Sequence, residues 1–510
     1  MRSRTSIGWL IGVLSAAVAV GVGELVAAFV RPAASPVIAV GNRIIVLTPA
    51  STKRSAIDNL GTNDKVILIA CIYVLLALIG AFTGELALRR LAYGLSGIAA
   101  VGGFGVYCTL TANAAHGTDV IPTIVGTAAA MVTMAVLVRV AGNPARDGSA
   151  ALLTDRRAFL QGTLATAALA AVAGFGGRAE QHRRFDVADA RAKIKLPPAQ
   201  GPSTAVPTGA DLGKSGAPWA TPNSRFYRID TALSVPQIKP SDWKLHIHGM
   251  VDTPITLTYD QVLARPLVER WITLSCVSNQ VGGDLVGNAL FRGTLLADLL
   301  REAGVHDDCD ELMLTSAEGM TIGAPTKVVL DGRDALLAVG MNGETLPVAH
   351  GFPARIVVPG LYGYVSACKW VVDIEATTFA KRSAYWVVEG WSAHPPIRLA
   401  SRIDTPRSQK VVSVGETVAI AGVAWDQHVG VDKVEVQIND GPWLSARLAT
   451  VPSTDTWRQW VLPWTPEKSG SYRLRVRATD ARGDVQDAEV RDPFPSGATG
   501  LHAVTVRAVV

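Results

Sequence analysis

The chain has few cysteines and lacks the common zinc-binding motifs. Among its 510 residues there are 5 cysteines, and neither C-x-x-C nor H-E-x-x-H occurs, so a zinc site has little support. Lys and Arg form no dense block, and the net charge is only +5. This charge pattern argues against a nucleic-acid partner.

Apolar residues, by contrast, make up 49% of the chain and gather as long runs in its first third. Each run is near the roughly 20 residues that a helix needs to cross a bilayer. Four of them lie in residues 1–141: Ile7–Val30, Val66–Leu86, Leu91–Leu110 and Val120–Val140. A fifth, Phe159–Gly174, is shorter and rich in Ala. The pattern predicts five transmembrane helices, and a soluble domain of buried helices is the alternative.

The arginines orient these spans. Three groups fall on one side if all five runs cross the bilayer: Arg2 and Arg4, Arg89 and Arg90, and Arg146, Arg156 and Arg157. The positive-inside rule makes that side cytoplasmic. Arg43, Lys53 and Arg54 lie on the opposite side and argue mildly against this orientation. Everything after about Gly177 is then expected outside the cytoplasm.

Within residues 142–178, a distinctive sequence stands at the start of the fifth run. Arg156 and Arg157 are followed by Ala158-Phe159-Leu160 and a weakly hydrophobic stretch of small residues. This order resembles a twin-arginine export signal, and two ordinary positive-inside arginines are the alternative. Such a signal would suit a domain that takes up a cofactor and folds before export.

Three further segments follow. Residues 179–217 mix charge, Pro and Gly and are expected to form a linker. In residues 218–400, short β-like runs such as WKLHIHGMV alternate with helix-like runs such as GTLLADLLREAG. In residues 401–510, strand patterns recur between turn signals, including Asn439-Asp440-Gly441. This last pattern predicts an all-β, immunoglobulin-like sandwich.

One cysteine stands at the end of an apolar run and before a glycine-rich turn, in ITLSCVSNQVGGDLVGN. This residue, Cys276, is one of three cysteines outside the apolar runs, with Cys309 and Cys368. An odd number leaves at least one thiol free, and a buried free thiol is one interpretation. A thiolate is also a soft metal ligand. Without His or carboxylate ligands nearby, an organic cofactor would have to complete the coordination of the metal.

Two longer stretches carry a resemblance to a known family. They are LSCVSNQVGGDLVGNALFRGTLLADLL and MNGETLPVAHGFPARIVVPGLYGYVSACKWV, which resemble the molybdenum-cofactor domain of the sulfite oxidase family. Residues 401–510 are similar to that family's dimerisation domain, and the apolar region is similar to the anchor of a bacterial branch. The resemblance implies a mixed α+β fold for residues 218–400 and a molybdenum cofactor with a single pterin.

The resemblance also implies roles for individual residues. Cys276 matches the protein ligand of molybdenum, and Arg228 matches an arginine that faces the anionic substrate. The residues implied to hold the pterin and its phosphate are His350, Arg355, Ala367, Cys368 and Lys369, with Ala367 and Cys368 acting through their backbone. Tyr385 is matched to an active-site tyrosine, with Trp386 as a competitor.

Some positions depart from the family or stand outside its motifs. Where animal sulfite oxidases have a second substrate-facing arginine, this chain has Val281, and where they have a pocket tryptophan it has Phe291. Sulfite as the substrate therefore does not follow. His246 and His248 are expected on one face of a strand, where they are interpreted as structural residues or as support for the site.

The resemblance implies an oxidoreductase that transfers an oxygen atom to or from a small oxyanion or sulfur-containing substrate outside the cytoplasm. Run in reverse, the same centre would reduce a sulfoxide or an N-oxide. With no cytochrome-type domain and no paired histidines in the apolar runs, no haem is expected. The implied partners are a lipid bilayer, a separate electron-transfer protein or quinone, and a second copy bound through the C-terminal domain. A membrane-tethered adhesion or structural protein, with no need for Cys276, is the rival interpretation.

Overall fold

The computed structural model describes residues 2–60, 63–112, 114–141, 152–201, 205–213, 216–395 and 397–510. They form two compact units, Met1–Val187 with Ala232–Gln237, and Ala188–Thr231 with Ile238–Val510. Of the twin-arginine-like segment, residues 142–151 and the side chains of Arg156 and Arg157 lie outside the described part. The export prediction therefore stays a prediction.

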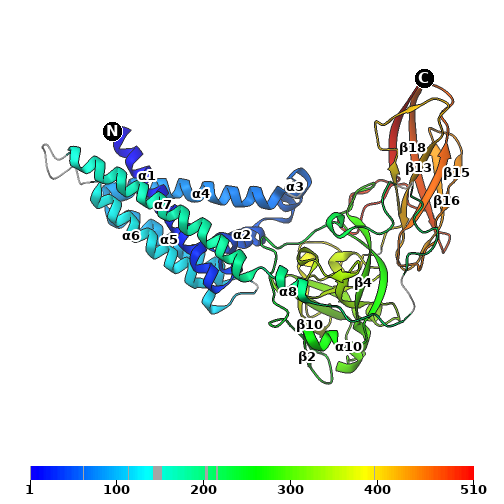
Figure 1. Cartoon of the computed structure of the whole chain (residues 1–510), viewed down its shortest axis with the longest axis horizontal. Coiled ribbons are helices and arrows are strands. Elements are labelled where there is room, and N and C mark those ends of the chain that lie inside the picture. The colour runs from blue at the N-terminus through cyan, green and yellow to red at the C-terminus, as the bar shows by residue number, and fades with distance from the viewer. Residues whose placement is uncertain are drawn as a thin grey trace. The chain divides into compact units, whose positions relative to one another are not determined.

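The first unit is helical. Its long helices are α1 (Arg2–Val30), α4 (Asp64–Arg89), α5 (Leu91–Leu110), α6 (Ile121–Val140) and α7 (Leu152–Phe185). Helix α1 packs against α4, α6 and α7, and α4 packs against α5 (Figure 1). Small residues allow this close approach: a Cβ on Gly12 would lie 1.8 Å from the Gly80 carbonyl oxygen. Among the described residues, five helices are long and apolar enough to cross a membrane, in agreement with the number of predicted runs.

Two parts of this unit are helical beyond the predicted apolar runs. The first loop contains α2 (Pro36–Leu47) and α3 (Ala50–Leu60). Helix α2 begins where Ser35 Oγ accepts a hydrogen bond from the Ile38 N–H at 3.4 Å, with Pro36 at the first helical position. Helix α7 continues to Phe185, past the expected start of the linker, and Glu180 pairs there with arginines three and four residues later.

The expected linker is also more ordered than its composition suggested. Helix α8 (Ala188–Lys193) follows α7. Further along, the Gln459 side chain accepts from the Leu212 N–H at 2.7 Å and donates to the Ala217 carbonyl at 2.9 Å. Ala210 is fully buried among tryptophans. The partners come from far along the chain, so no local pattern could indicate them.

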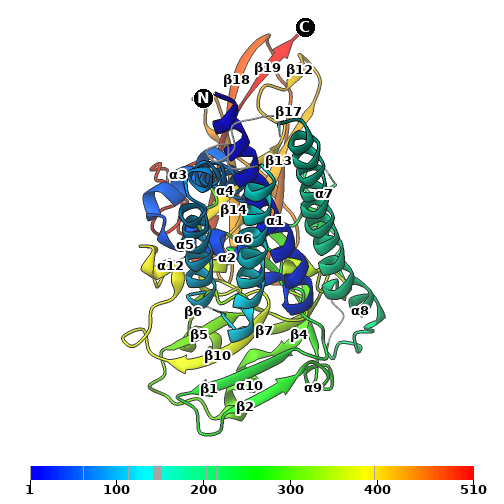
Figure 2. The same ribbon diagram turned by 90° about the vertical axis from the view of Figure 1, so that its left-hand side faces the viewer.

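The second unit begins with two sheets. One has the order β2 (Ile255–Thr258), β1 (Lys244–Gly249), β10 (Val371–Thr377), β5 (Glu311–Ser316) and β6 (Thr321–Pro325), as Figure 2 shows in part. The other has the order β3 (Val268–Ser275), β4 (Val286–Leu295), β7 (Leu336–Met341) and β8 (Glu344–Thr345), with β9 (Arg355–Val357) also paired to β7. The short helices are α9 (Tyr259–Leu263), α10 (Leu296–Ala303), α11 (Thr326–Val329) and α12 (Tyr385–Val388).

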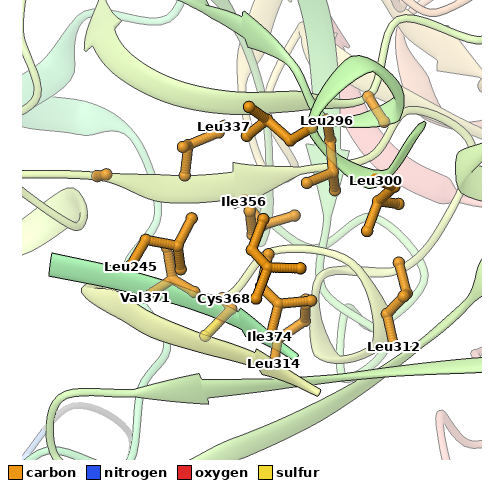
Figure 3. Close-up of a cluster of buried hydrophobic side chains, with 14 of the residues drawn as sticks. Leu245, Leu296, Leu300, Leu312, Leu314, Leu337, Ile356, Cys368, Val371 and Ile374 are labelled. Carbon is orange, nitrogen blue, oxygen red and sulfur yellow. The ribbon is translucent and has the colours of Figure 1, made fainter. Parts of the chain in front are cut away.

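The core of this part lies between the two sheets and α10 (Figure 3). Alternate residues of β1, such as Leu245 and Ile247, point into it and are 0% exposed. Leu296 and Leu300 fill it from the amphipathic α10, which ends at Gly304 with φ of +68°. The mixed α+β fold implied for residues 218–400 is present.

The C-terminal part is a two-sheet sandwich. One sheet has the order β11 (Ala400–Thr405), β13 (Val418–Trp425), β17 (Arg458–Trp464) and β16 (Arg447–Leu448). The other has the order β12 (Val411–Ser413), β19 (Ala503–Val509), β18 (Gly470–Asp480), β14 (Val431–Ile438) and β15 (Trp443–Ser445). Val434, Val436 and Trp460 lie in the core between the sheets. The predicted hairpin is present, since β14 and β15 pair antiparallel and Asn439 has φ of +52°.

Candidate active site

Cys276 directly follows β3 and begins the loop that joins β3 to β4. Its backbone N–H donates to the Leu285 carbonyl at 2.9 Å, and the Asn279 side chain accepts from the Leu285 N–H at 2.9 Å. Only 9% of Cys276 is exposed. Burial raises the pKa of its thiol, while hydrogen bonding from Ser278 and the charge of Lys369 oppose that rise. Burial therefore favours the protonated form of the thiol.

Asp230 joins the two candidate cations Arg228 and Lys369. Its Oδ2 atom lies 2.7 Å from Arg228 Nε and 2.7 Å from Lys369 Nζ. The Asp230 side chain is 3% exposed, whereas that of Arg228 is 39% exposed. Burial lowers the pKa of Lys369 to about 8, although Asp230 acts to raise it. Two cations share one carboxylate, so the group keeps a net positive charge.

His350 and Arg355 form a second buried pair. Arg355 Nη1 donates to the His350 carbonyl at 3.2 Å, and the His350 Nε2 atom donates to the Asn223 carbonyl at 3.1 Å. Burial lowers the pKa of His350 to about 4, and the charges of Arg355, Lys369 and Arg228 add to this effect. Burial also lowers the pKa of Arg355 to about 10. The Arg355 Nε atom is buried and has no hydrogen-bond partner among the described residues.

Five of the predicted residues form one group, because their charges affect one another's pKa values. The charge of Lys369 acts on Cys276, and the charges of Arg228 and Arg355 act on Lys369. The charges of Arg228, Arg355 and Lys369 all lower the pKa of His350. Tertiary structure thus gathers segments that are separated by up to about 140 residues along the chain, as the contact of Lys369 with Asp230 illustrates.

Ala367 and Cys368 lie on the short stretch that leads to Lys369. The Ala367 N–H donates to the Gly363 carbonyl at 2.9 Å. The Cys368 side chain is 0% exposed and lies in the hydrophobic core (Figure 3). Only the backbone of Cys368 is left for contact with a ligand. The ligand-holding roles of Ala367 and Cys368 stay predictions.

The tyrosines around Cys276 differ from the expected one. The Tyr385 N–H donates to Thr321 Oγ1 at 3.1 Å, and its ring meets Trp386 edge-on at 5.0 Å. Burial raises the pKa of Tyr227, Tyr362 and Tyr364, and a negative charge on Cys276 would add to this effect in each case. These three tyrosines therefore lie close to the thiol, and the role of Tyr385 stays a prediction.

The two positions that depart from the family have different surroundings. Phe291 is 0% exposed on β4, with the Arg355 guanidinium 5.7 Å above its ring centre. It therefore supports a candidate site residue from the core. Val281 lies in the Cys276 loop, 3.3 Å from the position that a Cβ on Gly500 would take. A residue of the C-terminal domain thus lies beside Val281 in the Cys276 loop.

The C-terminal domain braces β3 and the Cys276 loop. Arg402 Nη1 donates to the Gly283 carbonyl at 2.7 Å. The Gln427 side chain donates to the Thr273 carbonyl at 3.2 Å, and the Thr273 hydroxyl accepts from the Trp457 N–H at 2.7 Å. The segment that ends at Cys276 is therefore held by the sandwich as well as by its own sheet.

Several members of this site were missed in the sequence analysis. Asp230 and Tyr227 flank Arg228 in FYRID, and Tyr362 and Tyr364 lie in PGLYGYVSACKW. These residues lie a few positions along the chain from residues that match the family, and that proximity in sequence was the signal that could have indicated them. For Arg402 no such signal existed, because its contact with Gly283 joins residues 119 apart.

Two parts of the second unit each match a known protein family. Residues 232–386 match the family described as oxidoreductase molybdopterin binding domain, and residues 400–490 match the bacterial Ig domain family. The chain is 34% identical over 149 residues to the uncharacterized oxidoreductase YuiH of Bacillus subtilis, across 29% of this chain and 72% of that protein.

Some other relatives extend well beyond the region that they share with this chain. Mitochondrial sulfite oxidase of Drosophila melanogaster is 30% identical over 272 residues, across 49% of this chain and 46% of that protein, so this chain spans about half the length of that relative. The solved structure of the sulfane dehydrogenase SoxCD from Paracoccus pantotrophus aligns with 56% of this chain and 80% of its own, at 22% identity and a TM-score of 0.47. From the match to YuiH and the domain match, the chain belongs to a family of oxidoreductases with a molybdopterin-binding domain.

Proposed function

We propose that this protein is a membrane-anchored molybdenum-cofactor oxidoreductase that transfers an oxygen atom to or from a small sulfur-containing substrate outside the cytoplasm. The observation that carries the proposal is the grouping of a buried thiol, Cys276, with the cations Arg228, Arg355 and Lys369. Perturbed pKa values that arise from burial and specific charges are typical of functional sites.

The residues fit an anionic cofactor. Arg355 is 5% exposed, and none of the carboxylates in the described part of the chain forms an ion pair with it. A buried guanidinium with an unused N–H is costly unless an acceptor satisfies it. A phosphate offers such an acceptor with a matching charge. We infer that Arg355, His350 and Lys369 hold the pterin and its phosphate, with help from the backbone at Ala367 and Cys368.

Cys276 is proposed as the protein ligand of the metal. When bound, the molybdenum centre supplies oxygen-atom transfer with a two-electron change. Because metal ligation requires a thiolate, the proton that burial retains on the Cys276 Sγ atom has to leave when the cofactor is loaded. The Asn279 side chain, which accepts a hydrogen bond within the loop, and Arg402, which donates to the Gly283 carbonyl, would hold the Cys276 Sγ atom in a fixed position.

Arg228 is proposed to bind the substrate anion. Its guanidinium is partly exposed, and Asp230 holds it through Nε at 2.7 Å and Nη2 at 3.3 Å. A planar guanidinium has further N–H donors, which suits an oxyanion. Asp230 would orient this fork and, with Lys369, would connect the substrate side to the cofactor side of the site.

The remaining parts of the proposal concern the surroundings of the enzyme. Five helices in the described part of the chain are long and apolar enough to span a bilayer, and they support an anchor. The arginine pattern supports an active site outside the cytoplasm, and the Arg156-Arg157 pair supports export of the folded domain. A separate protein or a quinone would exchange electrons with the site, and the C-terminal sandwich would form a homodimer.

Reduction of an uncharged sulfoxide or N-oxide is the second candidate function. It is favoured by Val281, which stands where animal sulfite oxidases have a second substrate-facing arginine. With one cation fewer, the site would be less selective for an anion.

Metal analysis tests the proposal. The detergent-purified full-length chain should contain molybdenum and a pterin in proportion to protein, and Cys276→Ser should lower turnover by orders of magnitude without unfolding the chain. A folded wild-type chain without molybdenum, after expression with adequate molybdate, would favour the adhesion or structural alternative. Unchanged turnover in a metal-loaded Cys276→Ser variant would exclude Cys276 as the ligand.

A further inference from the structure

A second group of potential metal ligands lies on the outer face of the sheet β2-β1-β10-β5-β6. His246 and His248 alternate along β1 with the buried Leu245 and Ile247. Because side chains alternate across a strand, both imidazoles project from the side opposite the core. Their side chains are 47% and 32% exposed, so an ion could reach them from solvent.

The third member comes from the neighbouring strand. Asp373 on β10 is the register partner of His246, and β1 and β10 lie side by side (Figure 2). Asp373 Oδ1 is 3.4 Å from His246 Nδ1, and Asp373 Oδ2 is 3.1 Å from His248 Nε2. The two imidazole rings are stacked, with centres 4.5 Å apart and planes inclined by 15°. One carboxylate therefore faces two ring nitrogens at once.

This spacing suits a metal ion. The three ligand atoms all lie within 4.8 Å of one another. In a tetrahedral zinc site with bonds of about 2.0 Å, ligand atoms are separated by roughly 3.3 Å. The two imidazole-to-carboxylate distances, 3.4 Å to Oδ1 and 3.1 Å to Oδ2, are close to this value. They run to different oxygens, so rotation of the side chains would bring a single Asp373 oxygen and the two ring nitrogens around the ion. Water can fill the remaining position because the group is open to solvent.

The ligand types narrow the class of ion. Two imidazoles and one carboxylate suit Zn²⁺ and Cu²⁺, whereas Mg²⁺ and Ca²⁺ favour oxygen ligands. Glu375, the register partner of His248, is held by Arg382 at 2.6 Å. Other histidines make simpler pairs: His306 Nε2 lies 3.3 Å from Asp252, and His428 Nδ1 lies 3.0 Å from Asp455. In the described ranges, a group of three such ligands occurs only at His246, His248 and Asp373.

We propose that His246, His248 and Asp373 form a site for a divalent transition-metal ion of the zinc and copper class, separate in its ligands from the site of Cys276. Such an ion would tie β1 to β10, which are neighbours in the sheet but distant in sequence. Strand β10 begins directly after Lys369-Trp370, so the ion would brace the strand that leads away from the candidate cofactor site.

The test is a titration of the purified, cofactor-containing, full-length chain with Zn²⁺, followed by calorimetry. The wild type should bind one more Zn²⁺ ion per chain than His246→Ala/His248→Ala. The matched control is His306→Ala, which removes an exposed histidine from a single His–Asp pair in the same unit and should retain the wild-type stoichiometry. Equal stoichiometry in the wild type and the double variant would overturn the proposal, as would equally strong competition by Ca²⁺.

A second readout separates this site from cysteine ligation. Co²⁺ bound by two imidazoles and a carboxylate should give visible d–d bands without the near-ultraviolet charge-transfer band of a thiolate. Asp373→Asn, which keeps the size of the side chain, should weaken Co²⁺ binding at least tenfold. Zn²⁺ should also raise the melting temperature of the wild type and of His306→Ala, but not that of Asp373→Asn. Thiolate bands in the wild type, or an unaltered affinity in Asp373→Asn, would contradict the assignment.

Discussion

The imidazole of His502 lies directly against Gly282, in the loop that follows Cys276. A Cβ on Gly282 would come 2.2 Å from His502 Cδ2, and Gly282 has φ of +78°. His502 is itself fixed, because its Nδ1 atom accepts from the Ile403 N–H at 3.0 Å. The C-terminal sandwich thus requires a glycine in the loop of the proposed metal ligand.

Gly282→Ala should therefore displace the Cys276 loop. The new methyl group would have to move either the ring of His502 or the loop, in addition to the roughly 1–2 kcal/mol that a left-handed conformation costs an alanine. We expect a lower melting temperature and reduced molybdenum content in the purified chain.

Gly343→Ala is the matched control for that experiment. Gly343 has a similar φ of +83°, but a Cβ there would meet no atom within 4 Å. It should show the backbone strain alone and keep its molybdenum. If both variants lose the metal equally, contact with His502 is not what positions the loop.

Arg228→Met should weaken the binding of an anionic substrate. Hydrogen bonds to charged groups contribute about 1.5–3 kcal/mol, so KM for such a substrate should rise roughly 10- to 100-fold. Steady-state kinetics measure this, with an uncharged sulfoxide or N-oxide as the second substrate, for which the effect should be smaller. Arg301→Met, at an exposed ion pair with Asp298, is the control. Parental kinetics in Arg228→Met would exclude Arg228 from substrate binding.

His350 should make the protein sensitive to acid. Its pKa is lowered to about 4 in the folded chain, against about 6.5 for an ordinary imidazole. Between these values the unfolded chain binds more protons, so stability should fall as the pH falls through this window, by up to about 3 kcal/mol.

His350→Gln isolates this effect, because a glutamine amide can donate to the Asn223 carbonyl but does not titrate. Melting temperatures at about pH 6.5 and about pH 4.5 should differ less in His350→Gln than in the wild type. An identical difference in both proteins would show that other groups cause the acid sensitivity.

Changing Arg156 and Arg157 together to Lys should separate the two interpretations of this pair. Both charges remain, so the orientation of the fifth span should survive. A receptor that recognises paired guanidinium groups should reject the change, and residues 218–510 should then stay inside the cytoplasm. Protease accessibility in right-side-out spheroplasts is the measurement. Full accessibility of the double-Lys variant would rule out the twin-arginine signal.

Local pattern was sufficient for much of the fold. Runs of about 20 apolar residues predicted the long helices, because length and hydropathy decide whether a helix can cross a bilayer. Recurring strand patterns predicted the sandwich of residues 401–510, and Asn439-Asp440-Gly441 predicted the hairpin. The family motifs identified the segments of Arg228, Cys276, His350, Arg355 and Lys369, since each motif is continuous along the chain.

Tertiary structure decided what these segments meet. Asp230 holds Arg228 and Lys369 together, His502 and Arg402 brace the loop of Cys276, and Asp373 turns a pair of strand histidines into a three-ligand group. Each contact joins residues far apart in sequence, or residues whose side-chain directions depend on strand register. The sequence by itself determined which chemical groups were available and which elements carried them. Only the folding of distant strands against one another decided which groups came within bonding distance, because no local pattern specifies the register between strands that are separated by more than a hundred residues.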